Sequence, residues 1–273
     1  MASIAKRIAR GNGMDENFDF GKNWKHYSEN ALDQKKFTDA AESLKTLFGE
    51  ENFEGRRFLD IGCGSGIFSI AAKKMGARSV VGVDISQNSV EASQQNSKTF
   101  GLAPEDIHFF RMDILDRDKA RELGSFERVY SWGVLHHTGK MWEAIAIACE
   151  RVSPGGVFGL AIYDRHWTSP VWKKIKHFYN ASPVFLKKTT VFFFFPVIFV
   201  AYLAIGKNPF RLHRGMDFYH DVVDWVGGYP YEYARAEEVI DFMKKKGLRL
   251  KSFLPNRYVV GNNQFIFVKD FPS

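Results

Sequence analysis

The sequence predicts an α/β fold in which a parallel sheet carries helices on both faces. Between residues 55 and 163, short apolar runs alternate with segments of helical period. The first apolar run, 57–61, ends in a glycine-rich turn that leads directly into a helical segment. Alternation of this kind is typical of strand–helix–strand units with right-handed crossovers.

Each predicted element rests on its own pattern. Phe37, Leu44 and Phe48 recur at helical spacing, and Gly49 ends the helix that they predict. Ser86 is placed to cap a later helix. The sequence predicts helices over 33–48, 67–75, 86–99 and 140–152, and strands over 57–61, 79–83, 107–111, 128–132 and 157–163.

The alternation stops after residue 163 and resumes after residue 234. A helix over 236–246 precedes strands over 248–254 and 264–269, and the turn Gly261-Asn262-Asn263 favours an antiparallel pair. We therefore expect four parts: an N-terminal helical lid (1–54), a ligand-binding core (55–163), a helical insert or cap (164–234) and a C-terminal segment that completes the core (235–273).

The composition matches an ordinary globular protein. The chain has 273 residues, is 45% hydrophobic and 25% charged, and carries a formal charge of +7, which excludes disorder, collagen and coiled coil for its bulk. Cys63 and Cys149 fit neither a disulfide framework nor a zinc spacing. Residues 1–20 lack the apolar core of a secretory signal. The sequence thus predicts a reduced, cytoplasmic protein without a metal site.

The loop after the first predicted strand holds the strongest motif. Gly62, Gly64 and Gly66 permit a sharp turn and close approach of a ligand, and the next helix directs free N–H groups at that ligand. Asp84 ends the second strand, where a carboxylate accepts hydrogen bonds from a ribose diol. Asp113 follows the third strand, where it can receive an adenine amine.

A dinucleotide site makes similar demands on such a loop but fits this sequence less well. Its motif places a third glycine three positions after the second, whereas position 67 is Ile. Asp60 would repel a diphosphate, and its place suits a zwitterionic amino acid better. A tight turn that binds nothing is the remaining alternative.

Four motifs in order resemble those of class I S-adenosylmethionine-dependent methyltransferases. They are LDIGCGSG at 59–66, GVDIS at 82–86, MDIL at 112–115 and SWGVLHHTGKMWEAI at 131–145. Their local wording is similar to that of quinone-biosynthesis-type small-molecule O-methyltransferases. The resemblance implies a Rossmann-like seven-stranded sheet of order 3-2-1-4-5-7-6, with the last strand antiparallel. It also implies S-adenosyl-L-methionine as the cofactor of the 55–163 core.

The same resemblance implies which residues contact the cofactor. Trp24 and Tyr27, ahead of the first helix, would cover it by family analogy. The other implied contacts follow the four strands of the core: Asp60, Gly62, Cys63, Gly64, Gly66, Asp84, Ile85, Asp113, Ile114, Ser131 and Trp132.

Two histidines follow the fourth predicted strand, at the edge where ligands collect in such sheets. A neutral imidazole near its usual pKa of about 6.5 is a suitable proton acceptor for a hydroxyl nucleophile. His137 aligns best with the family's recurrent histidine, and His136 is the second candidate base. The alternative is that one or both only hold the loop in place by bonding backbone.

A second cluster, within 214–233, is rich in aromatic and hydrogen-bonding side chains. Such a mixture suits a pocket wall that stacks a ring and orients polar groups, and it equally suits an ordinary aromatic sub-core. The candidate substrate-binding residues are Arg214, Tyr219, His220, Tyr229 and Tyr231.

Residues 191–205 read VFFFFPVIFVAYLAI and contain no charge. A membrane-spanning helix needs about 20 apolar residues, and Pro196 is expected to break this one. A buried cap helix and a membrane-surface element are the remaining interpretations. The latter would place 183–214 on an anionic membrane and make the protein peripheral. Its basic rim would be Lys173, Lys174, Lys176, Lys187, Lys188, Lys207, Arg211 and Arg214.

The sequence therefore predicts an S-adenosylmethionine-dependent methyltransferase that acts on a small or lipid-linked acceptor, at oxygen. An RNA methyltransferase is a rival, although Ser131-Trp132-Gly133-Val134 stands where amino-methylating nucleic-acid enzymes often carry Asn/Asp-Pro-Pro-Tyr/Phe. Nucleic acid is accordingly a disfavoured partner. A non-catalytic cofactor-binding module and a nicotinamide oxidoreductase are further alternatives, and the glycine spacing disfavours the second.

Overall fold

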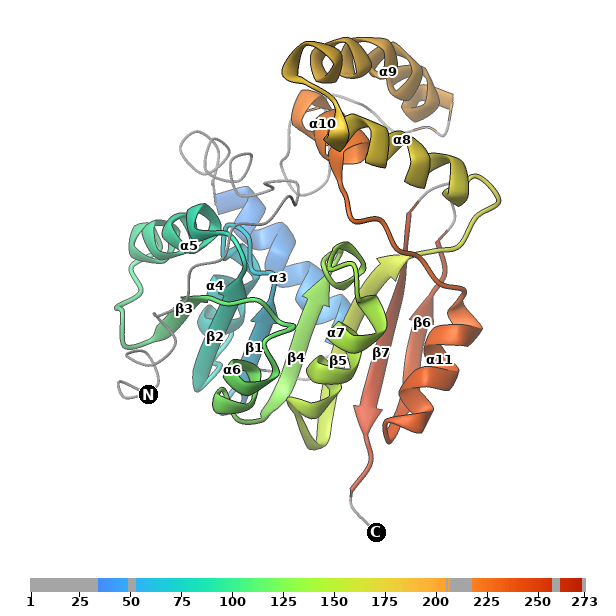
Figure 1. The fold of residues 1–273 in the computed structure, drawn as a ribbon. Coiled ribbons are helices and arrows are strands. Elements are labelled where there is room, and N and C mark those ends of the chain that lie inside the picture. The colour runs from blue at the N-terminus through green and yellow to red at the C-terminus, as the bar shows by residue number, and fades with distance from the viewer. Residues whose placement is uncertain (1–33, 49–52, 205, 207–217, 257–260, 272–273) are drawn as a thin grey trace.

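A computed structural model of the chain describes residues 34–48, 53–204, 206, 218–256 and 261–271. It contains a seven-stranded sheet of order β3-β2-β1-β4-β5-β7-β6, which confirms the predicted order (Figure 1). β7 is antiparallel to both neighbours, and the other neighbouring pairs are parallel. The strands are β1 (Arg57–Ile61), β2 (Ser79–Asp84), β3 (Ile107–Arg111), β4 (Phe126–Trp132), β5 (Val152–Tyr163), β6 (Leu248–Leu254) and β7 (Asn262–Lys269).

Helices cover both faces of the sheet, as predicted. One face packs in a core with α3, α4 and α5, and the other with α6, α7 and α11. Successive strand residues alternate between these two cores, with Phe58 on the first and Leu59 on the second, because strand side chains point to opposite faces. The helices are α3 (Gln34–Phe48), α4 (Ile67–Lys74), α5 (Gln87–Thr99), α6 (Arg117–Glu122), α7 (Met141–Glu150) and α11 (Ala236–Lys245).

Helix α3 is the described part of the expected N-terminal lid. Leu44, Leu47 and Phe48 are buried, in one core with residues of β1, β2 and α4. Gly159 of β5 lies so close that a Cβ there would sit 3.0 Å from atoms of Leu47 and Phe48. α3 is thus part of the layer that covers the sheet. Residues 1–33 lie outside the described residues.

The closing antiparallel pair is confirmed, but the expected turn is displaced. Asn262 and Asn263 already belong to β7, where they pair with Tyr163 and Ile162 of β5. The Asn263 side chain accepts a hydrogen bond from Asn256 N–H and donates one to Asp164, which ties β7 to the loop before it. Those two bonds hold Asn263 in the strand.

The insert forms a helical cap over the carboxyl edge of the sheet. It consists of α8 (Ser169–Ala181), α9 (Val184–Ala204) and α10 (Phe218–Gly227), and Figure 1 shows α9 as its outermost layer. The cap has its own small core, which contains Tyr179 of α8, Val191 and Ile198 of α9, and Val222 of α10.

Pro196 does not break α9, contrary to expectation. The helix runs for 21 residues through this proline. A proline inside a helix costs about 3 kcal/mol because it removes one hydrogen bond and crowds the preceding turn. Val191 and Ile198, on either side of Pro196, are buried. Burial of such a side chain stabilises by about 1.5–3 kcal/mol, which is enough to offset that cost.

Candidate cofactor and active site

The glycine loop joins β1 to α4 at the carboxyl edge of the sheet. Gly62 has a φ of 77°, and a Cβ there would lie 2.3 Å from a methyl carbon of Val134. Gly66 precedes α4 with a φ of 76°, and a Cβ there would lie 2.9 Å from Ser93. Both positions therefore require glycine, and the backbone N–H groups at the start of α4 face the same edge.

Asp84 ends β2 beside this loop. Its carboxylate accepts hydrogen bonds from Gly64 N–H at 3.0 Å and Ser86 N–H at 2.9 Å, which fix its orientation. The neighbouring Ile85 side chain is 48% exposed although it is large and apolar. A half-buried carboxylate for a ribose diol, next to an uncovered apolar side chain for an adenine ring, is the arrangement that a nucleoside needs.

Asp113 and Ile114 follow β3 on the same edge. The Asp113 carboxylate accepts a hydrogen bond from Leu115 N–H at 2.9 Å, which holds the turn, and the residue is half-buried. Ile114 is buried in the core between the sheet, α6 and α7, so its side chain supports the loop from below.

Asp60 is buried at the centre of the sheet. Its carboxylate accepts a hydrogen bond from the Ser69 hydroxyl at 2.7 Å. Burial, with a contribution from the charge of Asp84, raises the pKa of this carboxyl to about 7. A buried carboxyl with a raised pKa is stabilised in its charged form by a cation, and the ammonium of an amino acid supplies one.

The remaining predicted cofactor residues have structural contacts of their own. Cys63 is a free, buried thiol whose Sγ lies 3.6 Å from the Ser93 hydroxyl. The Ser131 hydroxyl donates to the Ile61 carbonyl at 3.1 Å and so joins β4 to β1. The Trp132 ring stacks on Tyr130 at 5.7 Å.

The donor set at this edge fits S-adenosylmethionine. Asp60, Asp84 and Asp113 end three neighbouring strands or lie just beyond them, and they suit an ammonium, a ribose and an adenine amine respectively. The charge of Asp84 acts on both Asp60 and Cys63, which shows that these groups are close together. Trp24 and Tyr27 lie outside the described residues.

His136 and His137 lie in a single 3-10 turn after β4 (Leu135–His137). The His136 ring is buried, and its Nδ1 accepts the backbone N–H of Tyr163 at 3.2 Å. Burial and the charge of His137 hold the pKa of His136 well below its usual value, so the ring is neutral and carries its proton on Nε2. This geometry matches the role of holding the loop against β5.

His137 has the opposite tautomer. Its Nδ1 lies 2.6 Å from the carbonyl oxygen of Pro230, which can only accept a hydrogen bond, so Nδ1 carries the proton and Nε2 carries the lone pair. Burial lowers the pKa of His137 to about 3, and the charge of Lys176 contributes. The ring is therefore neutral near pH 7, and Nε2 is the atom at which it would accept a proton.

The predicted substrate residues separate into different surroundings. Tyr231 is buried and packs on Tyr163 at 5.1 Å, within the aromatic group around the histidines. Tyr229 is half-buried against His177 of α8, and Tyr219 is more than half exposed on α10. Arg214 and the side chain of His220 lie outside the described part of the chain.

Lys176 of α8 belongs to this site, although the sequence places it on an exposed basic rim. It is only 2% exposed, its ammonium donates to the Trp225 carbonyl, and it lies 5.0 Å from the centre of the Tyr231 ring. Burial lowers the pKa of Lys176 to about 7, against the charge of Asp224. No local signal distinguishes it from its exposed neighbours, since α10 and Tyr231, both distant in sequence, contact it.

Asn262 is a second residue that the sequence did not single out for the site. It faces Tyr163 across the β5–β7 pair, and its amide nitrogen lies close to Gly133, in the turn between β4 and the histidines. Among the described residues, Asn262 Oδ1 and His136 Nε2 are buried polar atoms without a hydrogen-bond partner. Two unpaired buried polar atoms at one sheet edge suit a polar ligand.

Comparison with known proteins decides the family. A family model for the methyltransferase domain matches residues 32–197, more than half of the chain. The chain belongs to this methyltransferase family. The resemblance read from the four motifs is thereby confirmed, and with it the S-adenosylmethionine-dependent class.

Similar curated proteins match through part of their length. The chain is 43% identical over 108 residues to the ribosomal protein L11 methyltransferase of Ralstonia pickettii, covering 37% of this chain and 30% of the relative. It is 32% identical over 110 residues to the protein of that name from Shewanella woodyi, covering 40% and 34%. The match thus spans about a third of these relatives.

Solved structures share the fold. Magnesium protoporphyrin IX methyltransferase from Synechocystis, crystallised with S-adenosylhomocysteine, superposes with a TM-score of 0.54 at 16% identity over 98% of this chain and 94% of its own. PKMT2 from Rickettsia typhi, also bound to this product, gives 0.57 at 15% identity over 86% and 54%. At these identities the likeness extends to the fold alone.

Proposed function

We propose that this methyltransferase transfers a methyl group from S-adenosylmethionine to an oxygen of a small or lipid-linked acceptor. The observation that carries the proposal is the tautomer of His137. The bond from Nδ1 to the Pro230 carbonyl leaves the Nε2 lone pair as proton acceptor, next to the loop that follows β4. A hydroxyl nucleophile needs such an acceptor, whereas a carboxylate or thiolate does not.

S-adenosylmethionine, when bound, supplies an electrophilic methyl group whose carbon–sulfur bond breaks as the new carbon–oxygen bond forms. His137 takes the proton that the acceptor hydroxyl loses. Its low pKa keeps the ring neutral and places its contribution at the lower end of the range for general bases. His136 and Tyr163 hold the loop, and the unpaired Oδ1 of Asn262 can accept from a second polar group of the acceptor.

Methyl-labelled S-adenosylmethionine and a cell extract test the acceptor class. We expect label in the organic or small-molecule fraction, and that label should fall in His137→Ala. Label in ribosomal protein, as the names of the curated relatives suggest, or in RNA would overturn the proposed acceptor while leaving methyl transfer intact. If no label is transferred to the extract while the protein still binds S-adenosylhomocysteine, a non-catalytic binding module would be favoured.

A further inference from the structure

Helix α9 is apolar on all sides, and only one side is packed. Its inner residues Val191 and Ile198 are buried in the small core of the cap. Its outer side chains face solvent, with Phe192 82% exposed and Phe185 76% exposed. A helix that is apolar all round belongs in a protein core or a membrane, and the described chain leaves the outer face of α9 uncovered.

The exposed side chains form one stripe along the helix. They recur with the period of an α-helix over the full length of α9, which is about 30 Å at 1.5 Å per residue. The nine side chains of this stripe carry no charge, and the exposed Lys188 of α9 lies beside them. The outer stripe consists of Phe185, Thr189, Phe192, Phe193, Pro196, Val197, Val200, Leu203 and Ala204.

The segment of sequence that contains the outer stripe carries charge of one sign. Between residues 165 and 214 the sequence has nine Lys or Arg and no Asp or Glu. Lys173, Lys174 and Lys188 are exposed, and Lys187 is half-buried over the Tyr179 ring. Self-association through the stripe would bring two such basic segments together. The surface of an anionic bilayer, in contrast, offers an apolar layer to the stripe and negative headgroups to the basic residues.

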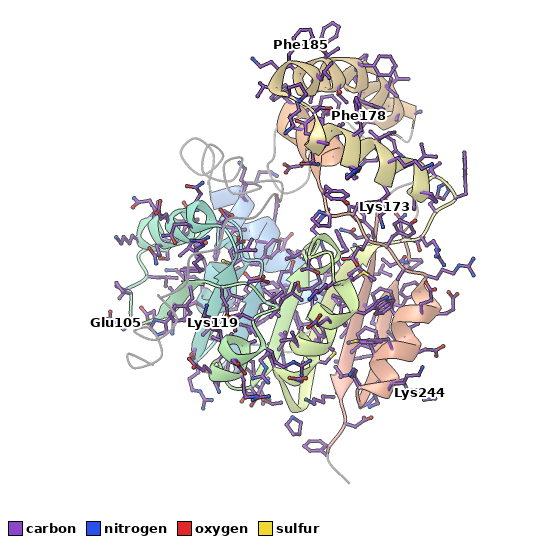
Figure 2. All side chains as sticks on the ribbon, viewed as in Figure 1. Glu105, Lys119, Lys173, Phe178, Phe185 and Lys244 are labelled. Atoms are coloured by element: carbon purple, nitrogen blue, oxygen red, sulfur yellow. The ribbon has the colours of Figure 1, made fainter. Side chains whose placement is uncertain are left out.

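The place of the helix in the fold suits a surface. α9 lies on the side of the cap away from the sheet, and Figure 2 shows Phe185 at its outer limit. Among the described residues, α9 is the one helix whose length and composition would allow it to cross a membrane. Crossing would separate it from α8 and α10, or draw Asp224 of α10 into the bilayer, so a flat orientation is favoured.

We propose that the outer stripe of α9 inserts into the surface of an anionic lipid bilayer, with the helix lying flat and the nearby lysines contacting lipid headgroups. The carboxyl edge of the sheet then faces the bilayer, because α8 and α10 lie between that edge and α9 (Figure 1). Membrane insertion goes beyond the proposed methyl transfer. Because vesicle binding is measured without turnover, each of the two proposals can fail while the other holds.

Flotation with lipid vesicles tests the proposal on the full chain. We expect binding to vesicles of equal parts phosphatidylcholine and phosphatidylglycerol. Phe192→Asp should weaken it by at least about tenfold, the effect of burying one large apolar side chain. Lys188→Gln should weaken it by about fivefold, and only on anionic vesicles. Because both side chains are exposed, neither variant disturbs the cap core.

Phe271→Asp is the matched control. Phe271 is 77% exposed and lies beside Gly155, near the start of β5, whereas the cap covers the opposite edge of the sheet. It should bind vesicles like the unchanged protein. No binding to anionic vesicles, or equal binding by the Phe192 and Phe271 variants, would overturn the proposal. Self-association that Phe192→Asp abolishes, in the absence of lipid binding, would assign the stripe to a second copy.

A bimane label tests the flat orientation, since Cys63 and Cys149 are buried and leave an introduced cysteine as the reactive one. Labels at Phe185→Cys and Val200→Cys should shift to the blue with anionic vesicles and be quenched to equal depth. A label at Glu105→Cys, on the body of the fold, should not shift (Figure 2). Quenching at very different depths at the two α9 positions would show a spanning helix and overturn the flat orientation.

Discussion

Asp60 is a buried carboxyl of the candidate cofactor site whose pKa is strongly raised. Its pKa is raised from 3.8 to about 7 by burial and by the nearby Asp84, so the folded protein without cofactor binds a proton that the unfolded chain releases above pH 4. The free energy of unfolding therefore decreases as pH rises from about 4 to 7 because of this group. A carboxylate that stabilised the fold would have the opposite effect, and the destabilisation agrees with the prediction that Asp60 binds the cofactor.

Asp60→Asn separates these two roles. We expect the variant to melt at a higher temperature than the unchanged protein near pH 8, because no carboxylate must be ionised in the core, and to lose this advantage near pH 4. Its affinity for S-adenosylhomocysteine, measured by calorimetry, should fall at least about tenfold. Asp118→Asn, at a side chain that is 93% exposed, should change neither quantity. Lower stability with unchanged affinity would assign Asp60 to the fold alone.

His137→Ala is expected to keep cofactor affinity and to slow methyl transfer by at least about tenfold. Since the pKa of His137 is about 3, the ring is neutral from pH 5 upwards, and kcat at saturating cofactor should not fall with a midpoint near 6.5. Cofactor affinity should instead weaken below about pH 7, as Asp60 takes up its proton. His108→Ala, in β3, is the control. Near-normal turnover in His137→Ala would contradict its role as a base.

The sequence indicated the type of most site residues but not their state. The carboxylates and glycines could be predicted because they stand at or just after strand ends. Asp84, for example, accepts hydrogen bonds from Gly64 N–H in the glycine loop and from Ser86 N–H two residues on. The tautomer of His136 depends on Tyr163, which is 27 positions away in β5. Burial of Lys176 depends on contacts with α10, 49 positions away. Such long-range contacts leave no trace in local spacing.

The turn after β1 packs directly against the turn after β4. Gly62 leaves room for Val134, the residue that directly precedes the 3-10 turn with both histidines. A side chain at Gly62 would displace that turn, so the cofactor loop and the candidate base are positioned by one contact.

Gly62→Ala tests this contact against Gly101→Ala. Both glycines have φ near 70°, but a Cβ at Gly101 meets nothing within 4 Å. Both variants therefore carry the strain of an alanine in the left-handed region. The difference between their free energies of unfolding isolates the clash with Val134. In urea unfolding, Gly62→Ala should lose at least about 1 kcal/mol more than Gly101→Ala. Adding Val134→Ala should restore part of it, and equal losses in the two single variants would refute the coupling.

The elements of the sheet were predictable and those of the cap were not. Parallel strands read as apolar runs ended by glycine or aspartate, and β1 to β4 lie within two residues of expectation. α9 offers no amphipathic period, because both its faces are apolar, and its proline suggested a break. The pairing of Asn262 with Tyr163 also required the fold, since asparagine and glycine together are typical of turns.

The molecule has two parts with separate cores. Within the part of the chain that the structure describes, the cap core shares no buried residue with the two cores that flank the sheet. The two segments that lead into and out of the cap run side by side, with Arg165 N–H donating to the Ala234 carbonyl at 3.2 Å and Asp164 bridged to Ala234. A small core on a narrow stem has less apolar burial to hold it than the sheet has.

We therefore expect the cap to open as a unit of its own. In native-state hydrogen exchange, amides of α8, α9 and α10 should exchange through an opening of lower free energy than those of β1, β4 and β5. Anionic vesicles should slow exchange in the cap and leave β3, at the far edge of the sheet, unchanged, because a ligand stabilises only the unit that it contacts. Equal protection of cap and sheet amides would show a single cooperative unit. Vesicle binding would then slow amide exchange in the glycine loop as well as in the cap.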